Sequence, residues 1–578
     1  MIHNMTKKTL IIVATLALLL APQTGQAARQ RLPKGTTVWG QVLVDGTPRA
    51  NVVVSDGADV TLTDKKGFYY LKSAKREGSV FVSIPSGTEV ETTWGMPHFW
   101  QRLNASEAGA ERHDFVLRAV DNSNYTVLAI SDVHLANLFD DMYQFKEVFM
   151  PRFMEEYEKA SANGPVYCLN CGDSVYDRYW YEYGYSIECF PATLEDVRFP
   201  VPMFHVMGNH DNDGGVPREG DIDFNAAERY RRTMGPTHYS FNLGREHYVV
   251  MDNIVYLNSE GRIDTYEGIT GKRDHEHYFT REQLDWLVKD LATVKDKDAP
   301  LVIAFHSPIL RHKGGLTDKK IEGRFLREGY DPDEMLNEFT ALLKDFREVH
   351  FISGHSHQNM LCYGADDTSR YPYIGNITEH NISGVCGCWW QPAAHGGLTL
   401  APDGGPAGFE VFPVKGDKME WYFVSTDDGA GQQFRVFDMN AVRDYYRSDG
   451  ALQAMLRHYD KRNDYGKIED NWLLINVWAW ESKWKISVTE NGVDLPVEHR
   501  KSENPQFTLD YYLPKAGWDD NSKNRWPAKY NEAGVKPHYF WAKASSPTST
   551  VVVKVTDSFG NEYVQTVERP KAFGKKMR

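Results

Sequence analysis

Five short apolar segments in the middle of the chain each lead directly into polar residues, and this arrangement constrains the fold more than any other feature. The segments are 125–130, 166–169, 203–206, 301–305 and 350–352. Stretches with helical periodicity, such as 151–159 and 281–291, lie between some of them, which is typical of an α/β organisation. Open α/β sheets place ligand-binding residues beyond the carboxyl ends of their strands. We therefore expect the five polar loops to meet at one edge of a sheet.

The polar loops contain aspartate, asparagine and histidine in a fixed order. They read Asp132-Val133-His134, Gly172-Asp173, Gly208-Asn209-His210-Asp211, His306-Ser307-Pro308 and Gly354-His355-Ser356-His357. Any one of these motifs alone is more simply explained as a cap, a turn or a buried histidine. All five in succession, each after an apolar strand, indicate a shared site instead.

This order of motifs resembles the calcineurin-like metallophosphoesterase superfamily over roughly residues 125–357, with Trp390 as the outer bound. The resemblance implies a fold of class α/β, a metallophosphoesterase β-sandwich flanked by helices. It also implies two metal ions that share one aspartate. The implied ligands of the first ion are Asp132, His134, Asp173 and His357, and those of the second are Asp173, Asn209, His306 and His355.

The chemistry of these residues agrees with that assignment. A carboxylate shared between two divalent ions offsets their repulsion, and a mixture of imidazole and oxygen donors suits Mn, Fe or Zn better than Ca or Mg. Two such ions clamp a phosphoryl group and lower the pKa of a shared water, so a metal-bridging hydroxide would attack phosphorus. His210 follows a ligand and matches the family residue that contacts the phosphoryl oxygen or protonates the leaving group. We assign it as general acid or transition-state stabiliser, with a purely orienting role as the alternative.

The sequence departs from the family pattern next to the bridging aspartate. Protein phosphatases of the superfamily carry an orienting Asp three residues after it, whereas this chain has Tyr176 there and Asp177 one position later. The partner that orients His210 therefore stays open. G-D-x-x-Y is also the purple acid phosphatase form, in which the Tyr binds iron. That group lacks a residue equivalent to His134, so we predict that Tyr176 is not a ligand.

β-rich sequence flanks the catalytic region on both sides. Closely spaced turn signals predict a small N-terminal β-sandwich over 34–118, and the stretches 40–48 and 63–69 resemble carboxypeptidase-regulatory or transthyretin-like domains. We place the catalytic domain at 122–395 and a β-rich C-terminal domain at 404–578, with hairpins around 484–489 and 550–556. The whole chain resembles three-part bacterial calcineurin-like proteins.

The first residues predict a signal peptide over 1–27. Lys7 and Lys8 precede an apolar run at 10–21, and Gly25-Gln26-Ala27 provides a small-x-small cleavage site. The run is shorter than the ~20 residues of a spanning helix, which favours cleavage over an anchor. We therefore expect a periplasmic or secreted protein with no transmembrane segment after signal removal. Cleavage changes the formal net charge from −14 to −16.

That acidic balance favours a small phosphorylated substrate and gives no general attraction to nucleic acid, so we expect no nucleic-acid partner. A nuclease is accordingly a weaker hypothesis. A different class is a metal-containing envelope binding protein whose β domains hold a glycan or protein. The complete ligand set argues against a decayed site, and turnover would separate the two classes. The motifs serve phosphomonoesterases and phosphodiesterases alike.

Several other chemically active residues have a simpler interpretation. We read Cys168 and Cys171, and the pair Cys386 and Cys388 in an expected strand, as core residues rather than redox or zinc sites. His275 and His277 are expected at the surface. Trp389 and Trp390 line a pocket or pack in the core. Loop residues that face phosphate or solvent are Arg178, Arg218, Arg311, His312 and Lys313.

Overall fold

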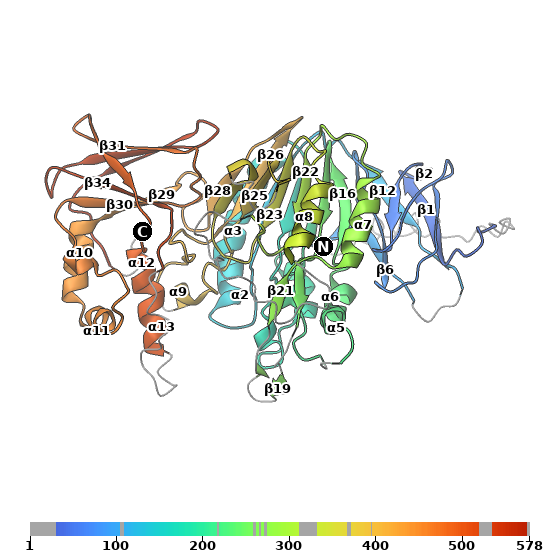
Figure 1. Cartoon of the computed structure of the whole chain (residues 1–578), viewed down its shortest axis with the longest axis horizontal. Helices are drawn as coiled ribbons and strands as arrows, with labels where there is room; N and C mark the ends of the chain where they lie inside the picture. Colours follow the sequence, from blue (N-terminus) through green and yellow to red (C-terminus); the bar gives the residue numbers. More distant parts are fainter. Residues whose placement is uncertain are drawn as a thin grey trace, which may run out of the picture.

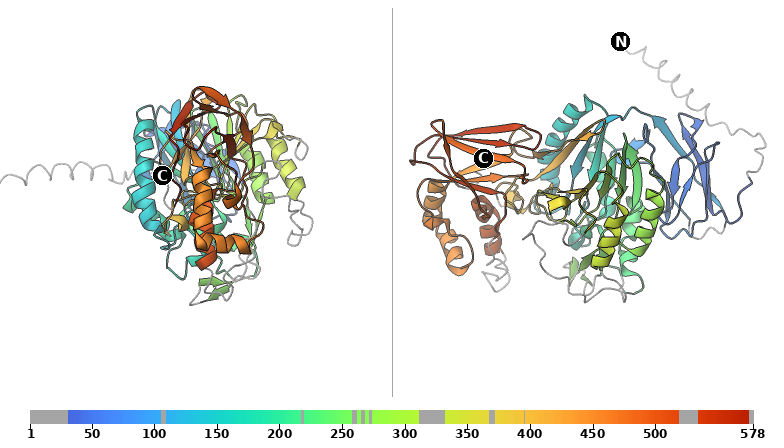
Figure 2. Two further views of the ribbon diagram at one scale, coloured as in Figure 1. Left: turned by 90° about the vertical axis from the view of Figure 1, so that its left-hand side faces the viewer. Right: turned by 45° about the horizontal axis from the view of Figure 1, so that its top comes forward.

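A computed structural model describes residues 31–104, 109–216, 219–257, 262–264, 268–270, 274–310, 332–366, 372–394, 396–518 and 534–574. The predicted signal peptide and Arg218, Arg311, His312 and Lys313 lie outside these residues. Figures 1 and 2 show β-rich regions from the two ends of the chain on opposite sides of a central α/β region. No helix in the described part of the chain is long and apolar enough to cross a membrane.

The N-terminal region forms two packed sheets, which confirms the predicted β-sandwich. The first contains β11 (Glu111–Arg112), β1 (Val38–Val44), β12 (Phe115–Ala119) and β7 (Thr88–Val90), with β2 (Thr47–Pro48) and β5 (Phe68–Leu71) also paired to β1. The second contains β10 (Trp100–Arg102), β6 (Ser79–Val82), β3 (Val53–Ser55) and β4 (Val60–Leu62). A small hairpin joins β8 (Thr92–Thr93) to β9 (Met96–Pro97). The buried apolar residues of the N-terminal β-sandwich are continuous with those of the catalytic core, so the two regions form one packed body.

The central region is built on two six-stranded sheets. The first has the order β15 (Met203–His205), β14 (Val166–Asn170), β13 (Asn124–Ile130), β26 (Gly408–Lys415) and β27 (Lys418–Met419), with β28 (Tyr422–Ser425) paired to β26. The second has the order β16 (Tyr239–Leu243), β17 (Glu246–Val250), β22 (Leu301–Ala304), β23 (Val349–Ser353), β25 (Ile377–Asn381) and β24 (Met360–Tyr363). The strands that precede the five motifs are all parallel to their motif-bearing neighbours.

Alternation along β13 explains how the sheets stack. Val127 and Ala129 lie in the core shared with the second sheet, whereas Leu128 and Ile130 lie in the core beneath the helices. The helices on that side are α2 (Asp141–Gln144), the π-helical turn η1 (Phe145–Phe149) and α3 (Met150–Ser161). The second sheet is covered by α7 (Arg281–Leu291) and α8 (Pro332–Leu342). The predicted β-sandwich flanked by helices is confirmed.

Short elements connect the strands of this region. They are η2 (Asp177–Tyr179), η3 (Ile187–Cys189), α4 (Phe190–Asp196), η4 (Asn209–Asp211), α5 (Ile222–Ala226), α6 (Glu228–Thr233), η5 (Gly364–Asp366) and α9 (Gln391–Ala394). Two small ribbons pair β18 (Ile254–Tyr256) with β21 (His275–His277), and β19 (Arg262–Asp264) with β20 (Gly268–Thr270).

The structure corrects the start of the C-terminal domain. We assigned all of 404–578 to that domain, but β26, β27 and β28 belong to the first catalytic sheet. β26 pairs antiparallel with β13 from Asn124↔Lys415 to Ala129↔Glu410. This pairing joins segments that are almost 300 residues apart, and no local sequence pattern signals such a contact.

The C-terminal region that follows contains two four-stranded sheets and a few helices. The sheets are β29 (Phe434–Asp438), β30 (Trp472–Val477), β34 (Tyr539–Lys543) and β33 (Val497–His499), and β32 (Val493–Leu495), β31 (Lys485–Glu490), β35 (Val551–Thr556) and β36 (Glu562–Val567). The helical elements are α10 (Met439–Ser448), α11 (Gly450–His458), η6 (Tyr465–Lys467), α12 (Pro505–Phe507), η7 (Thr508–Tyr512) and α13 (Leu513–Trp518). Both predicted hairpins are confirmed as β31–β32 and β35–β36.

The cysteines are buried where we predicted core residues, but one pair does not lie in a strand as we expected. All six lie in described residues and are free thiols, and Cys168 and Cys171 are fully buried at β14. Cys386 and Cys388 are buried too, but they lie in consecutive turns rather than in a strand. The backbone N–H groups of Val385 and Cys386 donate to the carbonyls of Ser131 and Asp132 in the first motif loop, and Gly387, Trp389 and Trp390 adopt positive φ.

Candidate active site

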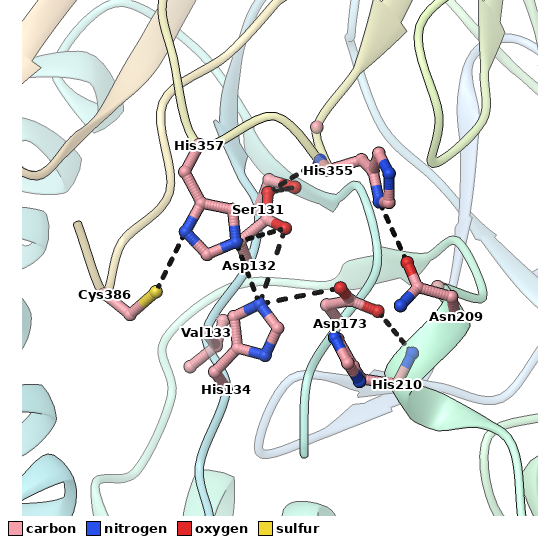
Figure 3. Close-up of polar contacts among 12 residues, drawn as sticks. Ser131, Asp132, Val133, His134, Asp173, Asn209, His210, His355, His357 and Cys386 are labelled. Carbon is pink, nitrogen blue, oxygen red and sulfur yellow. Dashed lines mark hydrogen bonds and ion pairs between the residues drawn. The ribbon is translucent and has the colours of Figure 1, made fainter. Parts of the chain in front are cut away.

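All eight side chains that the sequence assigned to the site converge at the carboxyl ends of five strands, and Figure 3 labels all of them except His306. Asp132 and His134 follow β13, Asp173 follows β14, and Asn209 and His210 follow β15. The second sheet contributes His306 after β22, and His355 and His357 after β23. Both sheets of the sandwich therefore supply residues to one site between their edges.

One group of potential ligands gathers around Asp132. Its Oδ1 lies 3.2 Å from His357 Nε2 and 3.6 Å from His134 Nε2, and the two Nε2 atoms are 3.1 Å apart. The other carboxylate oxygen, Oδ2, accepts from Ser131 Oγ at 2.6 Å and from the His355 backbone N–H at 2.9 Å. These donors hold the carboxylate so that Oδ1 faces the imidazoles.

A second group gathers around the amide of Asn209. Its Oδ1 lies 2.9 Å from His355 Nδ1 and 3.1 Å from His306 Nε2, and those two nitrogens are 3.2 Å apart. His306 is fully buried and Asn209 nearly so.

Asp173 lies between the two groups. Its Oδ2 is 3.5 Å from His134 Nε2 and 3.1 Å from His306 Nε2, so one oxygen atom faces both. Its Oδ1 accepts from the His210 backbone N–H at 2.7 Å. The carboxylate is thus oriented from one side and shared between the two groups on the other.

The backbone of the motif loops is held in an uncommon conformation. Asp132, His134, Asp173, His355 and His357 all have φ between +49° and +66°, in the left-handed region. Each such residue costs on the order of 1 kcal/mol or more, and such strain clusters at functional sites. These left-handed residues lie in the loops directly after β13, β14 and β23, where the chain must leave the strand and still direct its side chains into the site.

Two glycines of the motifs are required by close contacts. A Cβ on Gly208 would lie 2.2 Å from Asp173 Oδ1, and one on Gly354 would lie 1.7 Å from Ser131 Oγ. Any side chain at either position would displace the carboxylates of Asp173 or Asp132. The glycines therefore let the loops approach each other closely enough to form the site.

The donor atoms at the centre fit bound cations. His357 Nδ1 and His306 Nδ1 face the backbone oxygens of Gly387 at 2.6 Å and Cys171 at 2.8 Å, which can only accept. Both protons therefore reside on Nδ1 in the neutral rings, and the Nε2 lone pairs point into the site. Among the residues that the structure describes, Asp132 Oδ1 has no hydrogen-bond donor although it is buried. Lone pairs that converge without protons between them repel, and a cation relieves that repulsion.

The pKa shifts have the same origin. Burial works to lower the pKa of His306, but the carboxylates of Asp173 and Asp132 outweigh it and raise the pKa to about 9. Burial likewise opposes ionisation of Asp132, yet the imidazoles of His357 and His134 hold its pKa well below the usual range. The carboxylates of the site therefore stabilise a positive charge on any group that lies among them.

Asp177 answers the open question about His210. Its Oδ1 lies 2.7 Å from His210 Nδ1, and its Oδ2 accepts from Tyr256 Oη at 3.3 Å. Asp177 is almost completely buried, whereas the His210 side chain is 18% exposed. The displaced aspartate therefore orients the histidine, with Nδ1–H directed at Asp177 and Nε2 directed away from it.

Three family profiles match consecutive parts of the chain. The profile of the calcineurin-like phosphoesterase matches residues 125–359, that of its N-terminal region matches 36–120, and that of its C-terminal region matches 379–563. The chain belongs to the calcineurin-like phosphoesterase family. It is a metal-dependent phosphoesterase of the three-part type, as the sequence predicted.

Solved structures similar to this phosphoesterase include other phosphatases. A dimetal phosphatase from Danio rerio is 14% identical, with 52% of this chain and 96% of that chain covered and a TM-score of 0.32. A purple acid phosphatase from yellow lupin (Lupinus luteus) seeds is 13% identical, with 66% of this chain and 68% of that chain covered and a TM-score of 0.34. A comparison with curated proteins gives no match.

Some residues of the phosphoesterase site were not assigned from the sequence. Asp211, the last residue of the third motif, accepts from the backbone N–H groups of Gly208 and Asp173 at 2.9 Å and of Val175 at 3.2 Å. It therefore ties the second and third motif loops together. Its position at the end of the third motif was the sequence feature that could have identified it as a site residue.

Aromatic and sulfur-containing side chains border the first group. The Tyr176 ring lies 5.4 Å from that of His134 and 4.6 Å from that of His210, and the Trp389 ring lies 4.8 Å from that of His357. Cys386 Sγ lies 3.5 Å from His357 Nδ1. Both alternatives for the tryptophans therefore occur, because Trp389 borders the site while Trp390 is buried and donates to the Val133 carbonyl.

One expectation from the sequence is wrong. We placed His275 and His277 at the surface, but both are partly buried on β21 and face His355. The reason is that β18 and β21 form a ribbon that folds over the site, which the sequence pattern does not reveal. Arg178 is exposed and lies over the ring of Tyr179, with 5.4 Å between its guanidinium carbon and the ring centroid.

Proposed function

We propose that the chain hydrolyses phosphate esters with two divalent cations held on either side of Asp173. The observation that carries this proposal is the position of Asp173 Oδ2, within 3.5 Å of an imidazole nitrogen from each ligand group. Asp132, His134 and His357 complete one set, and Asn209, His306 and His355 complete the other. Each set then has four protein ligands when Asp173 is counted twice.

The donor types support Mn, Fe or Zn as the cations. Each set mixes two imidazoles with oxygen donors, a combination that suits these ions and not the oxygen-only preference of Ca or Mg. When bound, two such cations neutralise charge on a phosphoryl group and activate water as a nucleophile. The buried carboxylates and converging lone pairs described above fit that role.

His210 is placed to act on the leaving group. Because Asp177 accepts from Nδ1–H, the second ring nitrogen, Nε2, is the atom available to donate a proton or a hydrogen bond toward substrate. A nearby carboxylate also stabilises the protonated ring during proton transfer, as in other acid–base pairs. Partial exposure of the His210 side chain lets a substrate reach it.

Tyr176 supports this pocket without being required as a ligand. Its ring packs edge-on against both His134 and His210. We infer that this contact limits rotation of His210 about its side chain and that iron coordination by Tyr176 is not used. Substitution Tyr176→Phe keeps the ring and removes the oxygen. It should leave the metal content unchanged. The visible absorption spectrum of the metal-loaded protein should keep all its bands.

The predicted signal peptide supports a periplasmic or secreted location. Cell fractionation followed by N-terminal sequencing tests this directly. A mature chain beginning at Ala28 outside the cytoplasm agrees with the proposal, whereas a cytoplasmic chain that retains Lys7 and Lys8 contradicts it.

The enzymatic proposal is tested on residues 28–578 stripped of metal and resupplied with Mn, Zn or Fe. Release of nitrophenol from a phosphomonoester and from a phosphodiester is measured for each metal. We expect turnover that depends on added metal. Two bound metals with no turnover of any ester in a broad screen would instead favour an envelope binding protein.

A further inference from the structure

A pair of histidines on β21 lies beside the second ligand group. His275 and His277 are two residues apart on a strand, so both side chains project from one face and Glu276 from the other. Their rings are parallel, with 4.9 Å between centroids and 3° between planes. Both rings face His355 edge-on, at 5.8 Å and 5.0 Å between centroids.

The pair is held in place by the loop after β22. His277 Nδ1 is within hydrogen-bond distance of Ser307 Oγ, and Ser307 follows the ligand His306. The Ser307 backbone in turn pairs with the Asn253 side chain in both directions, at 3.0 Å and 2.6 Å. The ribbon that carries the histidines is therefore fixed relative to the second ligand group.

One polar atom of the pair lacks a partner. Among the residues that the structure describes, His275 Nδ1 is buried and makes no hydrogen bond. An unsatisfied buried polar group of this kind destabilises the folded protein, because it loses its hydrogen bonds to water and gains none in return. A ligand that hydrogen-bonds to it would recover that cost.

The chemistry of the pair favours an oxygen-bearing ligand over a third cation. One potential ligand nitrogen from each of His275, His277 and His355 lies within 4.8 Å of the others. However, His355 Nδ1 already faces Asn209 Oδ1 and the second ligand group. Within the described strand His275–His277, that leaves two imidazoles on one face and Glu276 on the other, and structural and catalytic zinc sites use at least three protein ligands.

We propose that His275 and His277 bind a terminal phosphoryl oxygen of the substrate and thereby select phosphomonoesters over phosphodiesters. This inference rests on the proposed two-cation hydrolysis. A phosphomonoester presents three terminal oxygens and a diester only two. If the two cations held two of these oxygens, the third oxygen of a monoester would be the acceptor for imidazole N–H donors on the His355 side. A diester places an ester oxygen with its substituent there, which accepts weakly and collides with the ribbon.

The test compares His275→Ala and His277→Ala with the control His98→Ala, an exposed histidine of the N-terminal domain. We measure kcat/KM for nitrophenyl phosphate and bis-nitrophenyl phosphate, the Kd of orthophosphate on the metal-loaded protein, and metal content. Loss of hydrogen bonds to a charged oxygen predicts about a 10- to 100-fold fall in kcat/KM for the monoester. Orthophosphate binding should weaken about as much, the diester rate should change less than about threefold, and both cations should stay.

Equal losses on monoester and diester, or unchanged monoester kinetics, would overturn the proposal. So would a third cation in the unsubstituted protein that disappears in His275→Ala. If the unsubstituted protein turns over neither ester, the proposed function fails by itself. Orthophosphate binding then still decides this inference, because it requires no turnover.

Discussion

Replacing Asp177 with Asn tests how His210 works. The substitution keeps the size of the side chain and removes the charge that faces His210 Nδ1 at 2.7 Å. Hydrogen bonds to a charged partner contribute about 1.5–3 kcal/mol, which corresponds to about a 10- to 160-fold loss of rate if the bond strengthens as the ring becomes protonated. Tyr256→Phe is the matched control, because it removes a longer, 3.3 Å hydrogen bond to the other oxygen of the same carboxylate and keeps the charge that faces His210, so it should cost a few-fold.

The assay measures kcat for two phosphate esters that differ in their leaving groups. Nitrophenolate leaves without protonation, whereas an alkoxide needs a proton, so the Asp177→Asn loss should be larger for an alkyl phosphate. Metal content should remain unchanged, since the Asp177 carboxylate faces His210 Nδ1 and Tyr256 Oη, neither of which belongs to a predicted ligand. Equal losses for both esters would refute a general-acid role, and loss of a cation would show that Asp177 supports the metal site instead.

Three further changes test other parts of the structure. Gly354→Ala places a Cβ 1.7 Å from Ser131 Oγ and 2.8 Å from Asp132 Oδ2, so cation affinity measured by calorimetry should fall at least tenfold. The control Gly450→Ala places its Cβ where no atom lies within 4 Å, so it should leave the affinity unchanged. Equal affinities in the two variants would contradict the argument that the motif loops need a glycine for close approach. Asn209→Ala should reduce the metal content by one ion per chain and abolish nearly all turnover, and a full metal content with near-normal rates would disprove the ligand assignment. Burial raises the pKa of Glu410 to about 8, from 4.5. Between these values the unfolded chain releases a proton that the folded chain keeps, so stability falls as pH rises, by at most about 5 kcal/mol. Glu410→Gln should remove this loss and melt higher than the unsubstituted protein at pH 8 but not at pH 4; identical pH profiles would contradict it.

The ligand positions could be predicted from the sequence because each follows a strand in a short motif. Asp132, Asp173 and His306 come shortly after apolar runs, and strand ends in parallel sheets meet at one edge. The order of the motifs also identified the family. Local pattern and spacing were therefore enough for the centre of the site and for the two-layered catalytic fold.

The rest depended on contacts between distant segments. His275 and His277 reach the site because β21 pairs with β18 in a ribbon that places both rings beside His355. β26 joins the catalytic sheet through its pairing with β13, which no local pattern encodes. The orienting role of Asp177 depends on where a single turn of 3-10 helix places its carboxylate after Tyr176. Sequence spacing alone could not decide whether Tyr176 or Asp177 orients His210.

The central claim is that Asp173 joins two cations held by the two ligand groups. Crystals of residues 28–578 grown with Mn, measured for anomalous scattering, test it most directly. We expect two Mn peaks about 3.5–4 Å apart, one on each side of Asp173, with Asp132, His134 and His357 around one and Asn209, His306 and His355 around the other. A single peak, or a second ion bound without Asn209 and His306, would contradict the account.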